Sequence, residues 1–599
     1  MADYTAPLAD IRFVLNDLVD LGALARLEGF ETAEPDLVEA VLEEAGKFAA
    51  EVLAPTNRAG DEHGARLENG MVRTAPGFAE AYRQFVAGGW NGVSCEAAWG
   101  GGGLPHVVAM AVQEMMTSAN MAFCLCPLLT QGATELIAAH GTEEQKRLYL
   151  GKLVSGEWTG TMNLTEPQAG SDVGALRSRA VKQADGTYRI TGTKIFITFG
   201  EHDMADNLIH LVLARLPDAP PGTRGISCFI VPKFLVNADG SLGARNDLRC
   251  VSIEHKLGIH GSPTCVMSYG DQGGAIGYLV GEENKGMHCM FTMMNAARLS
   301  VGLQGLAIAE RAYQQAVAFA RERRQGRSIG PDAIDNAPIV RHADVRRMLM
   351  LMKAQIEAMR ALIYLNAEAI DLSRHHPDAG VREAKQGLVE LLTPISKGWS
   401  TDLGVELTSV AVQIHGGMGF IEETGAAQHM RDARIAPIYE GTNGIQALDL
   451  VTRKLANQGG KPVARLLDDI GGTARDLSQA GGAELEVIGT VLDEAVAALR
   501  KATDWLVANL AKDPPAAAAG ASPYLRMFGI VIGGYLLGRQ ALTAQRKLAA
   551  GGGDDFCRAK LVTARFYAEQ VLPQAAAMLG PVTAGAGTLF ALPAELLSA

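Results

Sequence analysis

Hydrophobic residues recur at helical spacing through the first 160 residues of the chain. After Pro35-Asp36, apolar side chains follow one face through Leu37, Val38, Val41, Leu42, Ala45, Phe48 and Leu53. This spacing predicts an amphipathic helix over Leu37–Leu53. A glycine-rich stretch, Trp99–Pro105, interrupts the pattern, and helical spacing resumes at Val107.

Between about residues 161 and 285 the pattern changes to short runs rich in β-branched and aromatic residues. The runs are Tyr188–Thr191, Lys194–Thr198, Leu208–Ala214, Ile226–Val231 and Cys265–Tyr269. Turn signals such as Asp185-Gly186 and Asp239-Gly240 separate them. Because no ten-residue helix lies between the runs, we expect a compact antiparallel sheet rather than βαβ units.

Helical spacing returns from about residue 286, notably over Leu299–Arg324 and Ala343–Leu372. A Gly/Lys/Pro break at Gln458–Pro462 precedes further helical spacing from Leu485 to Leu510. The sequence therefore predicts a mainly α protein with a central antiparallel β domain and an extra C-terminal helical domain. The expected boundaries are an N-terminal helical domain 1–160, a middle β domain 161–285, a helical domain 286–460 and a C-terminal helical domain 461–599.

The charge balance and the cysteine positions argue against several kinds of function. The 599 residues carry 54 Lys+Arg and 66 Asp+Glu, a net charge of −12, which argues against a general nucleic-acid binder. Residues 463–599 hold 12 basic and 13 acidic side chains, so this tail offers no strong phosphate-binding face either. The eight cysteines form no Cys-x-x-Cys pair and no His-x-x-x-His occurs, so we expect neither a disulfide scaffold nor a metal site.

We expect neither a signal peptide nor a membrane segment. Acidic residues stand near the N-terminus where a signal peptide would be basic. The apolar run Met527–Gly538 would extend about 18 Å as a helix, short of the roughly 30 Å hydrocarbon core. Its Gly-x-x-x-Gly spacing occurs in paired membrane helices, but the flanking Arg526 and Arg539 favour close packing of soluble helices. We expect no integral membrane segment and a cytoplasmic location.

Three segments carry candidate chemistry. Met162–Asp172 contains Gly170-Ser171, whose backbone N–H and hydroxyl suit a phosphate or a polar cofactor edge. In Gln413–Phe420, glycines allow close backbone approach to a ligand. In Ile438–Gln446, Glu440 lies between an apolar approach and a glycine turn, where burial would make it a usable general base. Taken singly, these segments could equally be a surface loop, a helix–helix turn and a solvated or capping glutamate.

Together the segments resemble the acyl-CoA dehydrogenase family over about residues 35 to 455. The first signature of the family matches Leu164–Glu166 through Gly170–Asp172, and its strand motif matches Gly192–Thr198. Its helix motif matches Arg298 and then Glu322-Arg323, and its catalytic turn matches Tyr439–Thr442. The resemblance implies an FAD enzyme that forms a trans-2,3 double bond in an acyl-CoA thioester.

By the same resemblance, Glu440 removes the pro-R α-proton while a β-hydride passes to flavin N5. The flavin ribityl hydroxyl and the backbone N–H of Glu440 would polarise the thioester carbonyl. The implied FAD contacts are Met162, Leu164, Thr165, Phe196 and Thr198 at the isoalloxazine, Ser171 at the pyrophosphate, Thr442, and Arg323, Gln413 and Gly417 toward the FAD of a neighbouring subunit. The implied substrate contacts are Ser171, Arg298 and Gly441.

Some positions depart from the family pattern. Asn163 stands where a small residue is usual, Gln168 where Gly is common, and Phe196 where many members have Trp. Gly326-Arg327 replaces the usual Phe-Gly, which leaves the stacking on the adenine side open. Gly444 replaces a common Gln.

The length of the chain points to one branch of the family. It is about 200 residues longer than short-chain members, and its helical tail and the Gly-Ser-Pro-Thr at 261–264 resemble bacterial 3-methylmercaptopropionyl-CoA dehydrogenases. These act in dimethylsulfoniopropionate demethylation. The alternatives are a medium- or long-chain fatty acyl-CoA dehydrogenase of β-oxidation, an oxidase, and a flavin-binding non-catalytic or DNA-binding relative. The branch implies electron transfer flavoprotein as electron acceptor and a homo-oligomer, with a dimer favoured.

Overall fold

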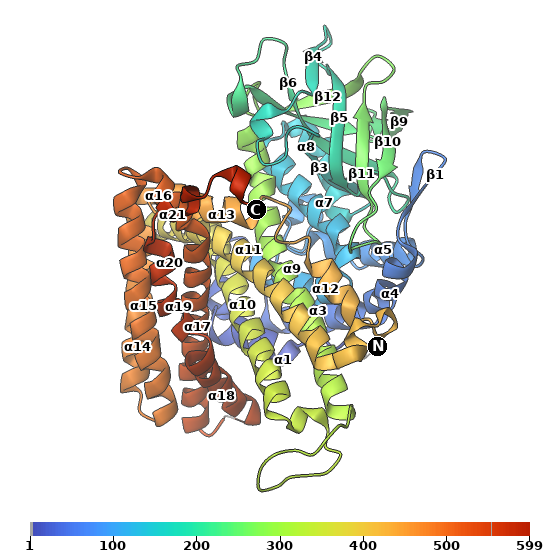
Figure 1. Cartoon of the computed structure of the whole chain (residues 1–599). Helices are drawn as coiled ribbons and strands as arrows, with labels where there is room; N and C mark the ends of the chain where they lie inside the picture. Colours follow the sequence, from blue (N-terminus) through green and yellow to red (C-terminus); the bar gives the residue numbers. More distant parts are fainter. Residues whose placement is uncertain (1–3, 553, 599) are drawn as a thin grey trace.

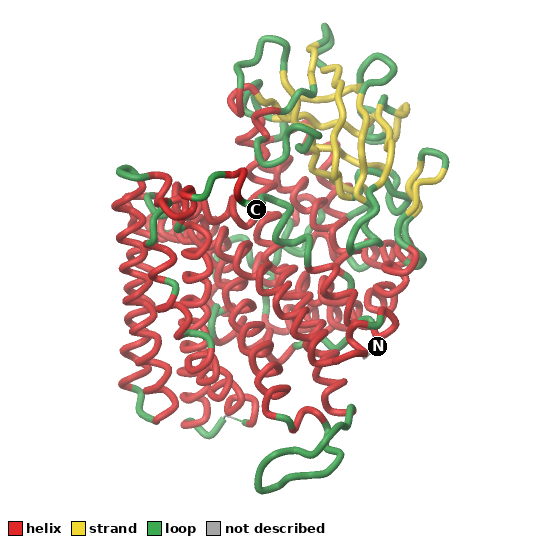
Figure 2. Tube along the Cα trace, in the orientation of Figure 1, coloured by secondary structure: helices red, strands yellow, loops and turns green. Residues whose placement is uncertain are grey.

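The computed structural model describes residues 4–552 and 554–598 as a mainly helical protein with a β domain at one end (Figure 1). The strands gather at that end, and helices make up the rest (Figure 2). The chain passes from N-terminal helices through the β domain into a second helical region and then into a C-terminal group of helices. The predicted fold class is confirmed.

The N-terminal helices follow the hydrophobic spacing of the sequence. The helix expected over Leu37–Leu53 runs from Pro35 to Phe48, and a π-helical turn, Ala49–Leu53, leads directly into the next helix. The elements of this region are α1 (Leu8–Asp17), α2 (Leu21–Leu24), α3 (Pro35–Phe48), α4 (Ala54–His63), β1 (Arg66–Glu68), β2 (Met71–Arg73), α5 (Phe78–Ala87), α6 (His106–Ala119), α7 (Met121–His140) and α8 (Glu143–Ser155).

The β domain differs from the expected sheet in two ways. The two runs on either side of Gly192 form one strand, and β3 pairs in parallel with β6, from Trp158 opposite Asn207 to Asn163 opposite Val212. The sheet is therefore antiparallel with a parallel edge pair rather than wholly antiparallel. Its strands are β3 (Trp158–Asn163), β4 (Arg179–Lys182), β5 (Tyr188–Thr198), β6 (Asn207–Arg215), β7 (Ile226–Pro232), β10 (Leu248–Ile253), β11 (Thr264–Tyr269) and β12 (Ala275–Val280), and β8 (Phe234–Val236) with β9 (Leu242–Arg245) forms a separate pair.

Three long helices form the second helical region: α9 (Gly286–Glu322), α10 (Ala343–His375) and α11 (Ala379–His415). Helices α9 and α11 run side by side in the same direction and touch at glycines. A Cβ on Gly305 would lie 2.1 Å from the Ser400 carbonyl oxygen, so only glycine fits there. Two short helices, α12 (Ala426–Ala433) and α13 (Asn443–Asp449), follow.

The C-terminal helices pack along α10 and α11 (Figure 1). Gly529, from the glycine-rich run, packs on Trp399 of α11, where a Cβ would lie 2.2 Å from the indole Cγ. The glycines thus serve close packing between helices within the protein. The helices are α14 (Lys461–Gln479), α15 (Ala483–Leu510), α16 (Pro514–Ala519), α17 (Ala521–Ala549), α18 (Asp555–Gln570), α19 (Pro573–Ala577), α20 (Leu579–Thr583) and α21 (Gly587–Ala591).

Helix α7 is the one helix in the described part of the chain that is long and apolar enough to cross a membrane. However, 78% of its apolar window is buried inside the protein. It packs against β3 and α9; a Cβ on Gly160 of β3 would lie 2.3 Å from the Ala133 Cβ. Its apolar character is therefore that of a core helix.

A buried ion-pair network joins the C-terminal helices to the rest of the protein. Lys560 of α18 is 3% exposed and contacts Glu357 of α10 at 2.9 Å and Asp10 of α1. Removing this ammonium would leave the buried Glu357 carboxylate and the half-buried Asp10 carboxylate with less compensation. We therefore predict that Lys560→Met lowers the free energy of unfolding by about 3 kcal/mol in urea denaturation.

The matched control is Arg558→Ala on the same helix. Arg558 pairs with Asp555 in an exposed ion pair, which contributes little. Equal effects of the two substitutions would contradict the importance of the buried network.

Candidate active site

Glu440 stands on a tight turn just before α13. Both Glu440 (φ 55°) and Gly441 (φ 82°) adopt left-handed backbone conformations. The Asn443 N–H closes the turn on the Pro437 carbonyl at 3.0 Å, and the Gln446 side-chain amide donates to the Glu440 carbonyl at 3.3 Å. A non-glycine residue in this conformation is strained, and such strain persists where surrounding contacts enforce it.

Two cations from different helices flank the partly buried Glu440 carboxylate. Arg298 comes from α9, and its Nη2 would lie 3.7 Å from a Cβ on Gly441. Lys397 comes from α11 and is completely buried. Burial raises the pKa of Glu440 to about 7, while the charges of Arg298 and Lys397 pull it down. The turn therefore presents a carboxylate that can accept a proton near neutral pH.

Arg298 keeps hydrogen-bonding capacity beside this turn. It is 7% exposed, and its Nη1 donates to the Asn295 side chain at 3.3 Å, while its Nε has no hydrogen-bond partner. Burial lowers the pKa of the guanidinium, which nonetheless stays charged. An unpartnered buried donor of this kind fits a polar or anionic ligand beside Gly441.

The first signature and the strand motif lie together at the end of the sheet. The Ile195 N–H donates to the Thr165 carbonyl at 2.9 Å. Below them, Lys194 and Glu166 form a buried ion pair at 2.9 Å, and Lys194 also donates to the Leu164 carbonyl. The structure thereby brings the predicted residues together: half-buried Met162 and Thr165 and buried Leu164 on one segment, and exposed Phe196 and half-buried Thr198 on β5.

Phe196 is presented outward by a bulge in β5. Two residues of β5, Ile195 and Phe196, face the single residue Val266 of β11, and Phe196 has a φ of 59°. The residue is 57% exposed. A bulky side chain held in a left-handed conformation with its ring in the open fits a planar ligand such as an isoalloxazine.

The departures in the first signature have structural partners. Asn163 is buried, donates to Thr161 at 2.7 Å and accepts from the Tyr269 hydroxyl at 2.7 Å. Gln168 donates to the Glu166 carboxylate at 2.7 Å. Both residues support the loop rather than interrupt it.

Arg323, Gln413 and Gly417 lie far from Glu440 in the same chain. They are exposed where α9 and α11 end, and Arg323 is 25 residues beyond Arg298, roughly 37 Å along the helix. Ser171 is exposed on the loop after β3, and Thr442 caps α13, accepting from the Ile445 N–H at 3.3 Å. The structure does not bring the first three residues to the Glu440 turn of their own chain.

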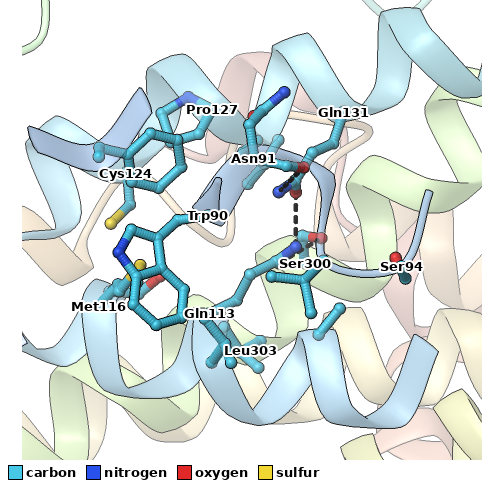
Figure 3. Close-up of a pocket in the computed structure, with 16 residues that line it drawn as sticks. Trp90, Asn91, Ser94, Gln113, Met116, Cys124, Pro127, Gln131, Ser300 and Leu303 are labelled. Carbon is cyan, nitrogen blue, oxygen red and sulfur yellow. Dashed lines mark hydrogen bonds between the residues drawn. The ribbon is translucent and has the colours of Figure 1, made fainter. Parts of the chain in front are cut away.

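A narrow cavity opens between α6, α7 and α9 (Figure 3). Its polar lining forms a chain: Gln113 donates to Gln131 at 2.5 Å, and Ser300 donates to Gln113 at 3.3 Å. The cavity has a volume of about 20 Å³, about the room needed by one ordered water. Leu303 lines it, and the adjacent Gln304 accepts a hydrogen bond from the Tyr439 hydroxyl, so the cavity lies beside the catalytic turn.

Sequence reasoning did not find Lys397 or the cavity residues. Lys397 stands in the apolar stretch Leu391–Trp399, and a lone lysine there was the signal available. Gln113 and Gln131 lie in largely apolar helices beside other polar residues, and their pairing across the cavity depends on how those helices pack.

Family models match four successive parts of the chain. The N-terminal domain of acyl-CoA dehydrogenase matches residues 36–157, its middle domain 161–271 and its C-terminal domain 284–455. A model described as acetyl-CoA dehydrogenase C-terminal like matches residues 466–593.

Similar proteins extend over nearly the whole chain. The 3-methylmercaptopropionyl-CoA dehydrogenase of Ruegeria pomeroyi is 50% identical over 97% of this chain and 98% of its own length. A butyryl-CoA dehydrogenase of Syntrophomonas wolfei is 36% identical over 95% of both chains. The structure of an acyl-CoA dehydrogenase complexed with FAD from Bacillus anthracis has a TM-score of 0.73, 20% identity, and covers 98% of this chain and 93% of that one. The chain belongs to the acyl-CoA dehydrogenase family, as the resemblance predicted, and is an FAD-dependent oxidoreductase that acts on a carbon–carbon single bond.

Proposed function

We propose that this acyl-CoA dehydrogenase oxidises 3-(methylthio)propanoyl-CoA to 3-(methylthio)acryloyl-CoA, a step in dimethylsulfoniopropionate demethylation. The main structural support for this reaction is the turn on which Glu440 lies near Arg298 and Lys397. The observation that supports this substrate is the 50% identity to the Ruegeria pomeroyi enzyme over 97% of the chain.

In this proposal Glu440 is the base that takes the α-proton of the thioester. Its raised proton affinity matches an acid made stronger by polarisation of the thioester carbonyl. The backbone N–H of Glu440 would donate to that carbonyl oxygen, and Arg298 and Gly441 would orient the acyl-CoA. Bound FAD supplies the acceptor for the β-hydride.

The residues brought together around β3 and β5 would hold the flavin. Phe196 would pack on its ring system, beside Met162, Leu164, Thr165 and Thr198. Ser171 would serve the pyrophosphate and the substrate, and Thr442 would contact the flavin. Arg323, Gln413 and Gly417 lie too far from Glu440 to serve its own site, which supports a role toward the FAD of a neighbouring subunit and hence a homo-oligomer, with a dimer favoured.

The cavity beside the catalytic turn supports a short acyl tail. The cavity has room for about one water and a polar lining that includes Asn91, Gln113, Gln131 and Ser300, so a long alkyl chain would not extend into it. A butyryl tail is the competing short substrate, as the name of the Syntrophomonas wolfei relative indicates. Electron transfer flavoprotein as acceptor and a cytoplasmic location remain predictions.

Replacing the base tests the proposed reaction. We predict that Glu440→Gln retains bound FAD but loses several orders of magnitude in kcat, because the amide cannot accept the α-proton. The measurement is anaerobic bleaching of the flavin by acyl-CoA in a stopped-flow instrument. Glu423→Gln is the control, and near-normal turnover in Glu440→Gln would assign the base elsewhere.

The raised proton affinity of Glu440 predicts a pH dependence. Only the ionised carboxylate accepts a proton, so the rate of flavin reduction should rise with pH and level off above the pKa of about 7. Single-turnover reduction between pH 5.5 and 9 measures this profile. A rate that is flat across the range would show that proton abstraction by Glu440 does not limit reduction.

A substrate panel tests the acyl tail. We predict that 3-(methylthio)propanoyl-CoA bleaches the flavin at lower concentration than butyryl-CoA, and both at lower concentration than octanoyl-CoA, because the cavity is narrow and polar. Anaerobic titration followed by visible absorbance gives the three half-saturation values. Strongest bleaching by octanoyl-CoA would identify a fatty acyl-CoA dehydrogenase instead.

A further inference from the structure

Lys397 is a buried cation with few partners. Its side chain is 0% exposed in the middle of α11, and its Nζ makes one hydrogen bond, at 2.8 Å to the Asn443 side-chain oxygen. Across residues 4–552 and 554–598, no carboxylate lies within 4.0 Å of this nitrogen. Keeping an ammonium so deeply buried is costly unless nearby negative charge compensates it.

Asn443 connects Lys397 to the catalytic turn. This asparagine stands three residues after Glu440, and its side-chain nitrogen donates to the Gly398 carbonyl at 3.0 Å and to Asp402 at 2.7 Å. Together with the bond from Lys397, these contacts attach the turn to one stretch of α11. The clamp formed by Lys397, Asn443 and Asp402 thus supports the segment in which Glu440 is held in a left-handed conformation.

The C-terminal helices close the site from behind. Leu525 of α17 covers the residue next to Lys397: a Cβ on Gly398 would lie 2.8 Å from its Cδ1. Trp399, the following residue, packs on Gly529 of the same helix. Helix α17 therefore covers α11 beside Lys397, where the low dielectric strengthens its attraction for Glu440.

We propose that Lys397 is a positioning residue for the base, which fixes the Glu440 turn through Asn443 and stabilises the ionised Glu440 carboxylate. The proposal rests on Glu440 as the base. Lys397 acts on the turn rather than on the substrate, since its hydrogen bond runs to Asn443 and it does not line the cavity beside α6 and α7.

The charges around the pair favour mutual stabilisation. Glu440 faces Arg298 of α9 and Lys397 of α11, and Lys397 also faces Asp402. Asp449, the last residue of α13, and Arg453, which follows that helix, act on Arg298 with opposite signs. Burial lowers the pKa of Lys397 to about 7, and Glu440 and Asp402 raise it against that effect. The charge of Glu440 thus favours the ammonium form of Lys397, and the charge of Lys397 favours the ionised form of Glu440.

Removing the charge of Lys397 should raise the pH at which the base works. An opposite charge nearby lowers the pKa of a carboxyl by one unit or more. In flavin-loaded Lys397→Met, we expect the midpoint of the pH profile for flavin reduction to move up by about one unit, with a rate about five-fold lower at pH 7 that recovers toward pH 9. Lys397→Arg should keep a profile close to that of the unmodified enzyme.

Three further variants separate charge from structure. Lys385→Met removes a lysine of the same helix that pairs with Glu368 and should leave the profile unchanged. Asn443→Ala loosens the clamp but keeps the charge, so it should lower the rate at all pH values without the same shift. Lys397→Gln also removes the charge and should show the same raised midpoint as Lys397→Met. It can replace Lys397→Met if that variant folds poorly.

The measurement is stopped-flow reduction by 3-(methylthio)propanoyl-CoA, and by butyryl-CoA in parallel. An unchanged midpoint in both charge-removing variants would overturn the proposal even if their rates fall. Normal reduction in Glu440→Gln would instead overturn the proposed base. The failure of the inference and the failure of the proposed function therefore give different results.

Discussion

The direct contact between α9 and α11 is the constraint on which the site depends. Gly302, Gly305 and Gly404 bring the two backbones together, and a Cβ on Gly404 would lie 2.9 Å from the Gly305 Cα. With no side chains between them, the helices carry Arg298 and Lys397 to opposite sides of one turn. A larger residue at any of these three glycines would push the helices apart and so change the environment of Glu440.

That environment gives Glu440 the proton affinity that the proposed base requires. Burial without the cations would raise the pKa of Glu440 further and leave the carboxyl protonated. The two cations without burial would lower its pKa and make it a weak base. The site combines both influences, and the pKa of about 7 results from their balance. The buried cations are in turn compensated by the carboxylate, so base and cations depend on one another.

The parts of the fold that were predictable have strong local patterns. The helix over Ala343–His375 begins where its apolar spacing begins, and the turn with Glu440 was found because its motif is local. Strand β3 was not predicted because Trp158–Asn163 contains Thr, Gly and Asn, which weaken the strand pattern. The prediction of two runs in place of β5 was wrong because Gly192 is held in the strand by its pairing with Tyr269 of β11, which is distant in the sequence. Lys397 could not be predicted for the same reason: its role arises from contacts with a segment 46 residues away.

The C-terminal helices gain a physical role from this arrangement. In the sequence they are an addition beyond the part shared with shorter members of the family, and their charge argues against a nucleic-acid surface. In the structure, Leu525 and Gly529 of α17 pack on Gly398 and Trp399, directly beside Lys397. Since exposure to water would weaken the attraction between Lys397 and Glu440, the packing of α17 helps set the proton affinity of the base. In the proposed reaction the extra domain would therefore act by excluding water behind the Glu440 turn, without contributing a residue to the cavity beside α6 and α7.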